Sequence, residues 1–235
     1  MPELTLARDG DVAILTLDDG KANALRPSNL AALDAALTEA LAARALCVRG
    51  RAGFFCAGFD LKAMPGLDRA RKHDLLALFS RVMHRIATYP RPTVAAVGGH
   101  AFGGGALLAL ACDVRLAADG PFRFATNEVA IGVPMPTLGV EICRSALAGA
   151  ALVETLMHGR VWTLPEARDR GVVEALHADV DVAALVRAQA LAKLPGEAYA
   201  ATKARTTGAA MDAAAKAMEA ELPAFVDAFE AMAAR

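Results

Sequence analysis

The sequence has few aromatic residues and almost no net charge. Aromatic side chains make up 5% of its 235 residues, and 25 Lys and Arg balance 26 Asp and Glu, for a formal net charge of −1. A chain without excess positive charge creates no overall field that would attract nucleic acid or an anionic membrane, although a local basic patch is not excluded by a total. We therefore expect neither of these as a partner.

The sequence also lacks long apolar runs and closely spaced cysteines. The longest apolar candidate, around 106–118, is interrupted by Asp113 and Arg115, whereas a membrane helix needs roughly 18 uninterrupted apolar residues. The first residues have no basic region and alternate apolar with polar side chains, unlike a signal peptide. The four cysteines are far apart, which is typical of buried free thiols rather than of a disulfide or a zinc site. These absences predict a cytoplasmic protein.

What the sequence does contain is apolar residues in regular patterns. The hydrophobic fraction of 55% excludes a disordered chain, and the length suits one large domain, or one domain with a helical appendage. Two alternating segments around Asp9 and Gly10 predict a β-hairpin. Continuous apolar strands then alternate with helical patterns, which favours an α/β fold with parallel strands. The expected hairpin strands are 4–8 and 12–17, the later strands 46–49, 93–97 and 114–118, and the helices 27–41, 68–87, 105–111, 137–147, 150–156, 165–170, 182–194, 197–207 and 211–235.

Two loops contain small residues in a pattern that could bind an oxygen atom. Gly98–Gly105 is a glycine-rich turn between a strand and a helix, where backbone N–H groups can meet an anion. It is not a dinucleotide fingerprint, because His100 stands where the second glycine should be. Cys56–Leu61 follows the preceding strand. Taken singly, each loop could be an ordinary turn, or glycines that permit close packing. Together they could place two N–H donors around one oxygen, which is an oxyanion hole.

Four segments occur in an order and spacing that resemble the crotonase (enoyl-CoA hydratase/isomerase) superfamily over essentially the whole chain. The resemblance implies a spiral of ββα units in residues 1–180 and a C-terminal helical region, residues 181–235, used in trimerisation. It implies a homotrimer or a dimer of trimers. The substrate would be an acyl thioester of coenzyme A that passes through a thioester enolate, with no cofactor beyond the CoA moiety and no metal. The segments are 19–25, 55–61, 103–115 and 127–134.

The resemblance also assigns roles to individual residues. The backbone N–H groups of Ala57 and Gly104 would form the oxyanion hole, and Glu128 would be the acid/base. Enoyl-CoA hydratases carry a second glutamate where this chain has Leu107. Because moving a double bond from C3 to C2 needs only one base, whereas hydration must also position water, this departure favours Δ3,Δ2-enoyl-CoA isomerase activity. Glu141 is either a second acid or a member of an ion pair.

The resemblance further implies a set of contacts to the CoA thioester. Lys21 and Lys62 could meet phosphates of the nucleotide or be solvated surface lysines, and Asp60 could also be structural, accepting backbone N–H bonds as Asp113 would. Two alternatives to the isomerase stay open: an enoyl-CoA hydratase, and a catalytically weak acyl-CoA-binding protein. The expected contacts are Lys21, Ala24, Ala57, Asp60, Leu61, Lys62, Gly104, Leu107 and Pro134.

Overall fold

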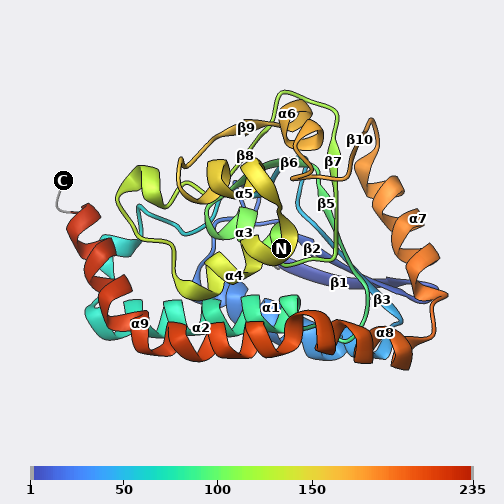
Figure 1. Cartoon of the computed structure of the whole chain (residues 1–235), viewed down its shortest axis with the longest axis horizontal. Helices are drawn as coiled ribbons and strands as arrows, with labels where there is room; N and C mark the ends of the chain where they lie inside the picture. Colours follow the sequence, from blue (N-terminus) through green and yellow to red (C-terminus); the bar gives the residue numbers. More distant parts are fainter. Residues whose placement is uncertain (1–2, 234–235) are drawn as a thin grey trace.

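The structure, a computed structural model, describes residues 3–233 and begins with the expected hairpin (Figure 1). Strands β1 (Leu4–Asp9) and β2 (Val12–Leu17) pair antiparallel, with Leu4 opposite Leu17. The larger sheet has the strand order β1-β2-β3-β5-β7-β10, and every pair after the hairpin is parallel. Its other strands are β3 (Ala45–Arg49), β5 (Thr93–Val97), β7 (Val114–Ala118) and β10 (Ala175–His177).

A second, smaller sheet corrects part of the sequence analysis. Strand β6 (Gly99–Phe102) lies inside the segment 98–105 that was expected to be only a turn, and β4 (Gly53–Cys56) lies in an expected loop. A Cβ on Gly99 would be 2.0 Å from the carbonyl carbon of Gly53, so glycine lets these two strands approach closely. The order is β4-β6-β8-β9, with β8 (Arg123–Ala125) and β9 (Trp162–Thr163).

The two sheets are built from successive units of the chain. Each of the pairs β3/β4, β5/β6 and β7/β8 contributes its first strand to the larger sheet and its second strand to the smaller one. Helices α2 (Arg69–Ala87) and α3 (Gly104–Leu110) complete the first two units. The expected α/β fold, a spiral of ββα units, is therefore confirmed.

The remaining helices agree with the expected ranges to within a few residues. The Asp68 carboxylate accepts the Arg71 N–H (2.8 Å) and so caps the start of α2. The expected helix 211–235 begins earlier, at Ala209, and its last two residues lie outside the described part of the chain. These helices are α1 (Pro27–Glu39), α4 (Thr137–Ala146), α5 (Gly149–Leu156), α6 (Leu164–Asp169), α7 (Val180–Ala192), α8 (Gly196–Lys203) and α9 (Ala209–Ala233), with a π-helical turn at Ala204–Gly208.

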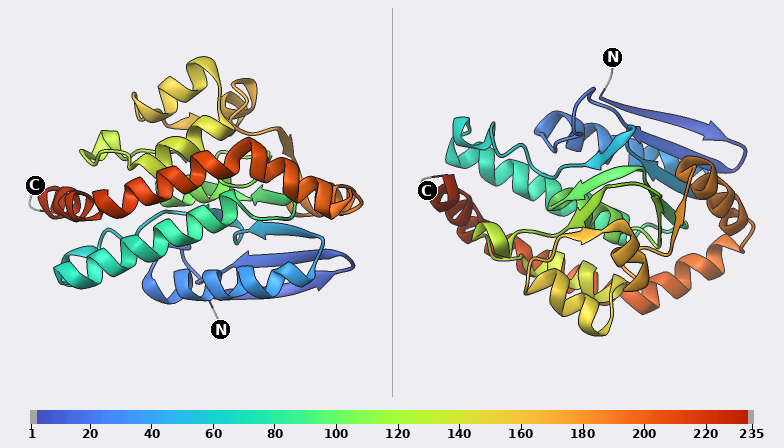
Figure 2. Two further views of the ribbon diagram at one scale, coloured as in Figure 1. Left: turned by 60° about the horizontal axis from the view of Figure 1, so that its bottom comes forward. Right: turned by 90° about the horizontal axis from the view of Figure 1, so that it is seen from above.

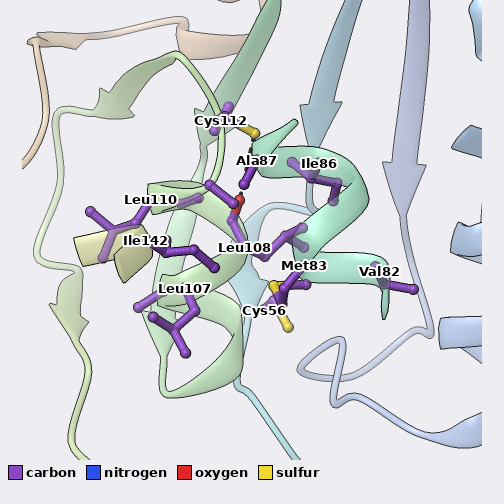
Figure 3. Packing of buried hydrophobic residues seen from close by; sticks show 14 of the residues in the cluster. Cys56, Val82, Met83, Ile86, Ala87, Leu107, Leu108, Leu110, Cys112 and Ile142 are labelled. Atoms are coloured by element: carbon purple, nitrogen blue, oxygen red, sulfur yellow. Dashed lines mark hydrogen bonds between the residues drawn. The ribbon is translucent and has the colours of Figure 1, made fainter. Parts of the chain in front are cut away.

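Helix α3 lies at the centre of the main core. All seven of its residues are buried, and it contacts both α2 and α4. Figure 3 shows Leu107 and Leu108 of α3 among side chains of α2, such as Met83, and Ile142 of α4. The opposite face of the larger sheet is covered by α7, whose Ala184 packs there. A helix surrounded by apolar side chains keeps a fixed position, so its N-terminus is a rigid element.

Helix α9 folds back along α2 and α4 of its own chain (Figure 2). The Lys72 ammonium of α2 pairs with Glu230 (3.1 Å), and the Glu221 carboxylate accepts the backbone N–H of Thr137, the first residue of α4 (2.9 Å). The C-terminal region is helical as expected, whereas its role in trimerisation and the boundary at residue 181 stay predictions. Across residues 3–233, none of the helices has the length and apolar character needed to cross a membrane.

Candidate active site

A cavity of about 70 Å³ lies where the N-terminus of α3, the loops after β4 and β8, and the side of α9 meet. We call it the Glu128 cavity. Fifteen described residues line it, and Asn127 and Glu128 are the only two of them with polar side chains. Four of the expected site residues besides Glu128 come together here: Ala57, Leu61, Gly104 and Leu107. The cavity is thus an apolar pocket with a single carboxylate.

One edge of the cavity is formed by the first turn of α3. The N-cap residue, Gly103, has φ +51° and ψ −125°, a conformation that glycine adopts without strain. The next residue, Gly104, is the first of the helix, so its N–H has no partner within the helix. A Cβ on Gly104 would lie 2.9 Å from Leu25 Cδ1 and 3.0 Å from Phe79 Cε2, so only glycine fits without moving these side chains. No acceptor among residues 3–233 takes the Gly104 N–H, so it is available to donate to a ligand oxygen.

The second expected donor, the N–H of Ala57, is already used within the protein. It donates to the carbonyl oxygen of Ala22 at 3.0 Å. An N–H that donates to a carbonyl is not available to an oxyanion, which corrects the assignment of this role to Ala57.

Two residues further on, the N–H of Phe59 has no acceptor among residues 3–233. The chain turns between them at Gly58, whose φ is +77°, and a Cβ there would lie 3.2 Å from the Gly104 nitrogen. The residue before Phe59 therefore lies against the N-terminus of α3. The Phe59 and Gly104 N–H groups are the pair that the structure leaves available at this edge of the cavity.

The Glu128 carboxylate is the only ionisable group of the described cavity lining. Its residue is 8% exposed, and Oε2 has no hydrogen-bond partner among the described residues. Burial disfavours the charged form and raises the pKa of Glu128 from 4.5 to about 7. A Cβ on Gly103 would be 3.4 Å from Glu128 Oε1, which places the carboxylate beside the start of α3. A carboxyl group with a pKa near neutrality suits it to accept and return a proton.

The carboxylate is carried by a well-anchored loop after β8. Thr126 Oγ1 donates to the Thr155 carbonyl of α5 (3.1 Å), and the Glu128 carbonyl accepts the Val133 N–H (2.9 Å). These bonds fix the backbone on both sides of Glu128, so its side chain projects from a defined position.

Leu107 occupies the position at which the resemblance expects the second glutamate of a hydratase. Its side chain is 2% exposed and lines the cavity one turn into α3. A Cβ on Gly139 would be 3.4 Å from Leu107 Cδ1, so α4 packs closely against it. The Leu107 side chain itself can neither transfer a proton nor accept a hydrogen bond from water.

Sequence reasoning missed the aromatic wall of the cavity. Five of the nine phenylalanines in the chain line it, and two of these come from α9. The Phe59 ring lies 4.8 Å from that of Phe79 and 5.7 Å from that of Phe229. The available signal was the pair Phe225 and Phe229, spaced four apart on one face of a helix. The five are Phe59, Phe79, Phe102, Phe225 and Phe229.

Other expected contact residues lie around the cavity without lining it. Lys21 and Lys62 are exposed, and Ala24 is half-buried. Asp60 Oδ1 accepts the Ala63 N–H (3.1 Å) and Oδ2 lies 3.8 Å from Arg26, which agrees with the structural role considered for this residue. Contact of these four residues with coenzyme A stays a prediction.

Pro134 and Glu141 are also separate from the Glu128 cavity. Pro134 is exposed and lines a neighbouring hollow. Glu141 is half-buried on α4, and among the described residues it has no ion-pair partner within 4.0 Å. An ion pair of Glu141 within the described residues is therefore absent, whereas a pair between subunits and a role as second acid stay predictions.

A larger hollow, of about 870 Å³, lies between α2 and α9, but charged side chains in its lining are already paired. Its lining includes Arg81, His84 and Asp212, and the last two are paired with each other at 2.7 Å. Arg81 in turn pairs with Asp34 (2.7 Å). These charges are already compensated at an open surface, so we place the active site at the smaller cavity.

Comparison with known proteins identifies the class. Residues 7–235 match the model of the family described as enoyl-CoA hydratase/isomerase, and the chain belongs to this family. Its fold is that of the crotonase superfamily. The chain is 32% identical over 196 residues to "Probable enoyl-CoA hydratase" of Bacillus subtilis, a match that covers 82% of this chain and 75% of that protein.

Among similar solved structures, some are named as enoyl-CoA isomerases and others as enoyl-CoA hydratases. An enoyl-CoA isomerase structure from Mycobacterium tuberculosis has a TM-score of 0.87 at 31% identity, covering 95% of this chain and 98% of that one. A second structure of the same protein, named a probable enoyl-CoA hydratase, has a TM-score of 0.90 at 30% identity, covering 99% and 100%. Human mitochondrial Δ3-Δ2-enoyl-CoA isomerase has a TM-score of 0.90 at 22% identity, over 99% of this chain and 94% of that one, which supports the fold alone.

Proposed function

We propose that this enzyme moves the double bond of a 3-enoyl-CoA to the 2-position. The observation that carries the proposal is the single carboxylate, Glu128, in a cavity whose other lining is apolar apart from Asn127. Isomerisation needs one group that removes a proton from C2 and returns it at C4. Nothing in this reaction requires water, and Leu107 leaves no place for the second glutamate of a hydratase.

The proposed mechanism uses two backbone donors and one side chain. The thioester oxygen accepts hydrogen bonds from the N–H groups of Phe59 and Gly104, and Glu128 removes a C2 proton. The electron pair of that C–H bond moves into the thioester, and the charge develops on its oxygen. Each such donor typically lowers the barrier by about 2.7–4 kcal/mol. The enolate then collapses through the former double bond, and Glu128 delivers the proton to C4, so the protein ends as it began.

The test is a paired assay with purified protein. We expect robust formation of 2-enoyl-CoA from 3-enoyl-CoA and little hydration of 2-enoyl-CoA. The variant Glu128→Gln should lose at least 10²-fold in kcat, because general acid–base catalysis typically contributes 10²–10⁴-fold, while its affinity for coenzyme A stays nearly unchanged. Fast hydration with negligible isomerisation would exclude the proposal, and retained activity in Glu128→Gln would exclude the role of that residue.

Enoyl-CoA hydratase is the second candidate, and Asn127 is the observation that favours it. Its amide is the one polar side chain besides Glu128 among the described lining residues, so it is the group that could hold a water molecule there. The names of several relatives point the same way. If the enzyme hydrates 2-enoyl-CoA through this water, Asn127→Leu should abolish hydration and spare isomerisation.

A third candidate, a protein that binds acyl-CoA with little turnover, keeps the cavity but not the activity. Binding without turnover of either substrate would support it. We further propose a cytoplasmic homotrimer or dimer of trimers that needs no cofactor beyond the CoA moiety of its substrate. Light scattering coupled to size-exclusion chromatography measures the assembly, and a monomeric mass would exclude it.

A further inference from the structure

A second hollow lies against the Glu128 cavity and is more than three times larger. Its volume is about 250 Å³, compared with about 70 Å³. We call it the Pro134 hollow. Pro136 and Phe225 line both spaces, so these two side chains form the partition between them. The hollow is lined by Pro134, Met135, Pro136, Glu221, Ala224 and Phe225.

The partition is held in place from both sides. The Phe225 residue is 5% exposed, and its ring centre lies 5.0 Å from that of Phe229. One helical turn earlier, Glu221 binds the Thr137 N–H (2.9 Å), which directly follows Pro136. One helical element therefore carries both the wall residue and the bond that fixes its distance from α4.

We propose that Phe225 limits the length of the acyl chain, and that the enzyme acts on short chains because this ring closes the way into the Pro134 hollow. This inference rests on the proposed function only in placing the acyl group in the Glu128 cavity. The thioester end is held by the N–H groups of Phe59 and Gly104, so a longer chain must continue along the apolar lining. The space beyond that lining exists, and Phe225 separates it.

The test compares two phenylalanines of α9 that differ in one respect. Phe225 borders both spaces, whereas Phe229 lines only the Glu128 cavity. Phe225→Ala should therefore join the two spaces, and Phe229→Ala, which removes the same atoms, should not. The measured quantity is the ratio of kcat/KM for 12-carbon over 6-carbon 3-enoyl-CoA. The same ratio is taken for the binding affinities of dodecanoyl-CoA and hexanoyl-CoA by calorimetry.

We expect the wild-type enzyme to favour the 6-carbon compounds and Phe225→Ala to raise both ratios at least tenfold. Each newly buried methylene contributes about fourfold in affinity, so two suffice. Phe229→Ala should lower kcat, because its ring contacts that of Phe59, while leaving the ratios within threefold of wild type. Phe225→Leu, a smaller change, should give intermediate ratios and serves if the alanine variant does not fold.

Three results would overturn the inference: a wild-type preference for the 12-carbon compounds, unchanged ratios in folded Phe225 variants, or an equal rise in Phe229→Ala. The binding ratios separate this inference from the proposed function. If neither reaction is catalysed but Phe225→Ala still shifts the affinity ratio, the partition is confirmed and the isomerase proposal fails.

Discussion

Replacing Glu128 by glutamine should make the protein more stable at alkaline pH while it destroys activity. Burial raises the pKa of this carboxyl group in the folded protein from 4.5 to about 7. Between these two pH values the carboxyl group is mostly protonated in the folded state and mostly ionised in the unfolded chain. The stability that this proton provides is complete below pH 4.5 and is lost as pH rises through about 7.

The size of the effect follows from the same two values. A difference of about 2.5 pKa units corresponds to about 3 kcal/mol of unfolding free energy, and this is fully lost only above pH 7. Glutamine has nearly the same shape and no charge, so Glu128→Gln should exceed wild type by about 3 kcal/mol at pH 9 and by almost nothing at pH 4.5. For a chain of this length the gain at pH 9 is about 6–12 °C in Tm.

The assay is thermal and urea unfolding of both proteins across this pH range, at one fixed protein concentration because assembly adds to stability. Glu141→Gln, a half-buried change on α4 outside the cavity, is the matched control, because it makes the same substitution away from the Glu128 cavity. Parallel stability curves for wild type and Glu128→Gln would refute the reasoning, because they would show that the buried carboxylate does not destabilise the fold.

Three further predictions concern activity and folding. The kcat/KM of the wild-type enzyme should rise with pH through about 7 and reach a plateau, since Glu128 must be ionised to accept a proton; a flat profile from pH 5 to 9 would contradict this. Gly58→Ala should abolish turnover, because its Cβ would lie 2.7 Å from the Phe102 carbonyl oxygen at a positive φ, as steady-state kinetics would measure. Asp113→Ala should destabilise the protein by about 3 kcal/mol in urea unfolding, by leaving Lys203 without its partner at 2.7 Å; KM should not change.

The strands of the larger sheet, apart from β10, could be predicted from the sequence because their signals are local. Strands Thr93–Val97 and Val114–Ala118 have the predicted bounds, since both are mainly apolar segments, with Arg115 as their one charged residue, between proline, glycine or aspartate. Strands β8, β9 and β10 are only two or three residues long. Such strands exist because a neighbouring strand pairs with them, and no periodicity of their own indicates them.

The candidate site, too, could be predicted only in part from the sequence. Glu128, Gly104 and Leu107 were singled out by the resemblance to the crotonase superfamily, and the structure brings the three to one cavity. The direction of a backbone N–H is not a property of the residue type. At Ala57 and Phe59 it depends on the turn at Gly58, so the sequence indicated the loop but not the donor. The aromatic wall was missed because it joins segments far apart in the chain.

The position of α9 in the chain has a consequence for protein synthesis. The ribosome makes α9 more than a hundred residues after Gly104, which at about 5–20 residues per second is a delay of roughly 5–20 s. Until Phe225 and Phe229 arrive, the rings of Phe59 and Phe79 lack their cover from this helix. The apolar lining of the Glu128 cavity is thus incomplete on the nascent protein, and apolar surface exposed in this way favours chaperone binding or aggregation.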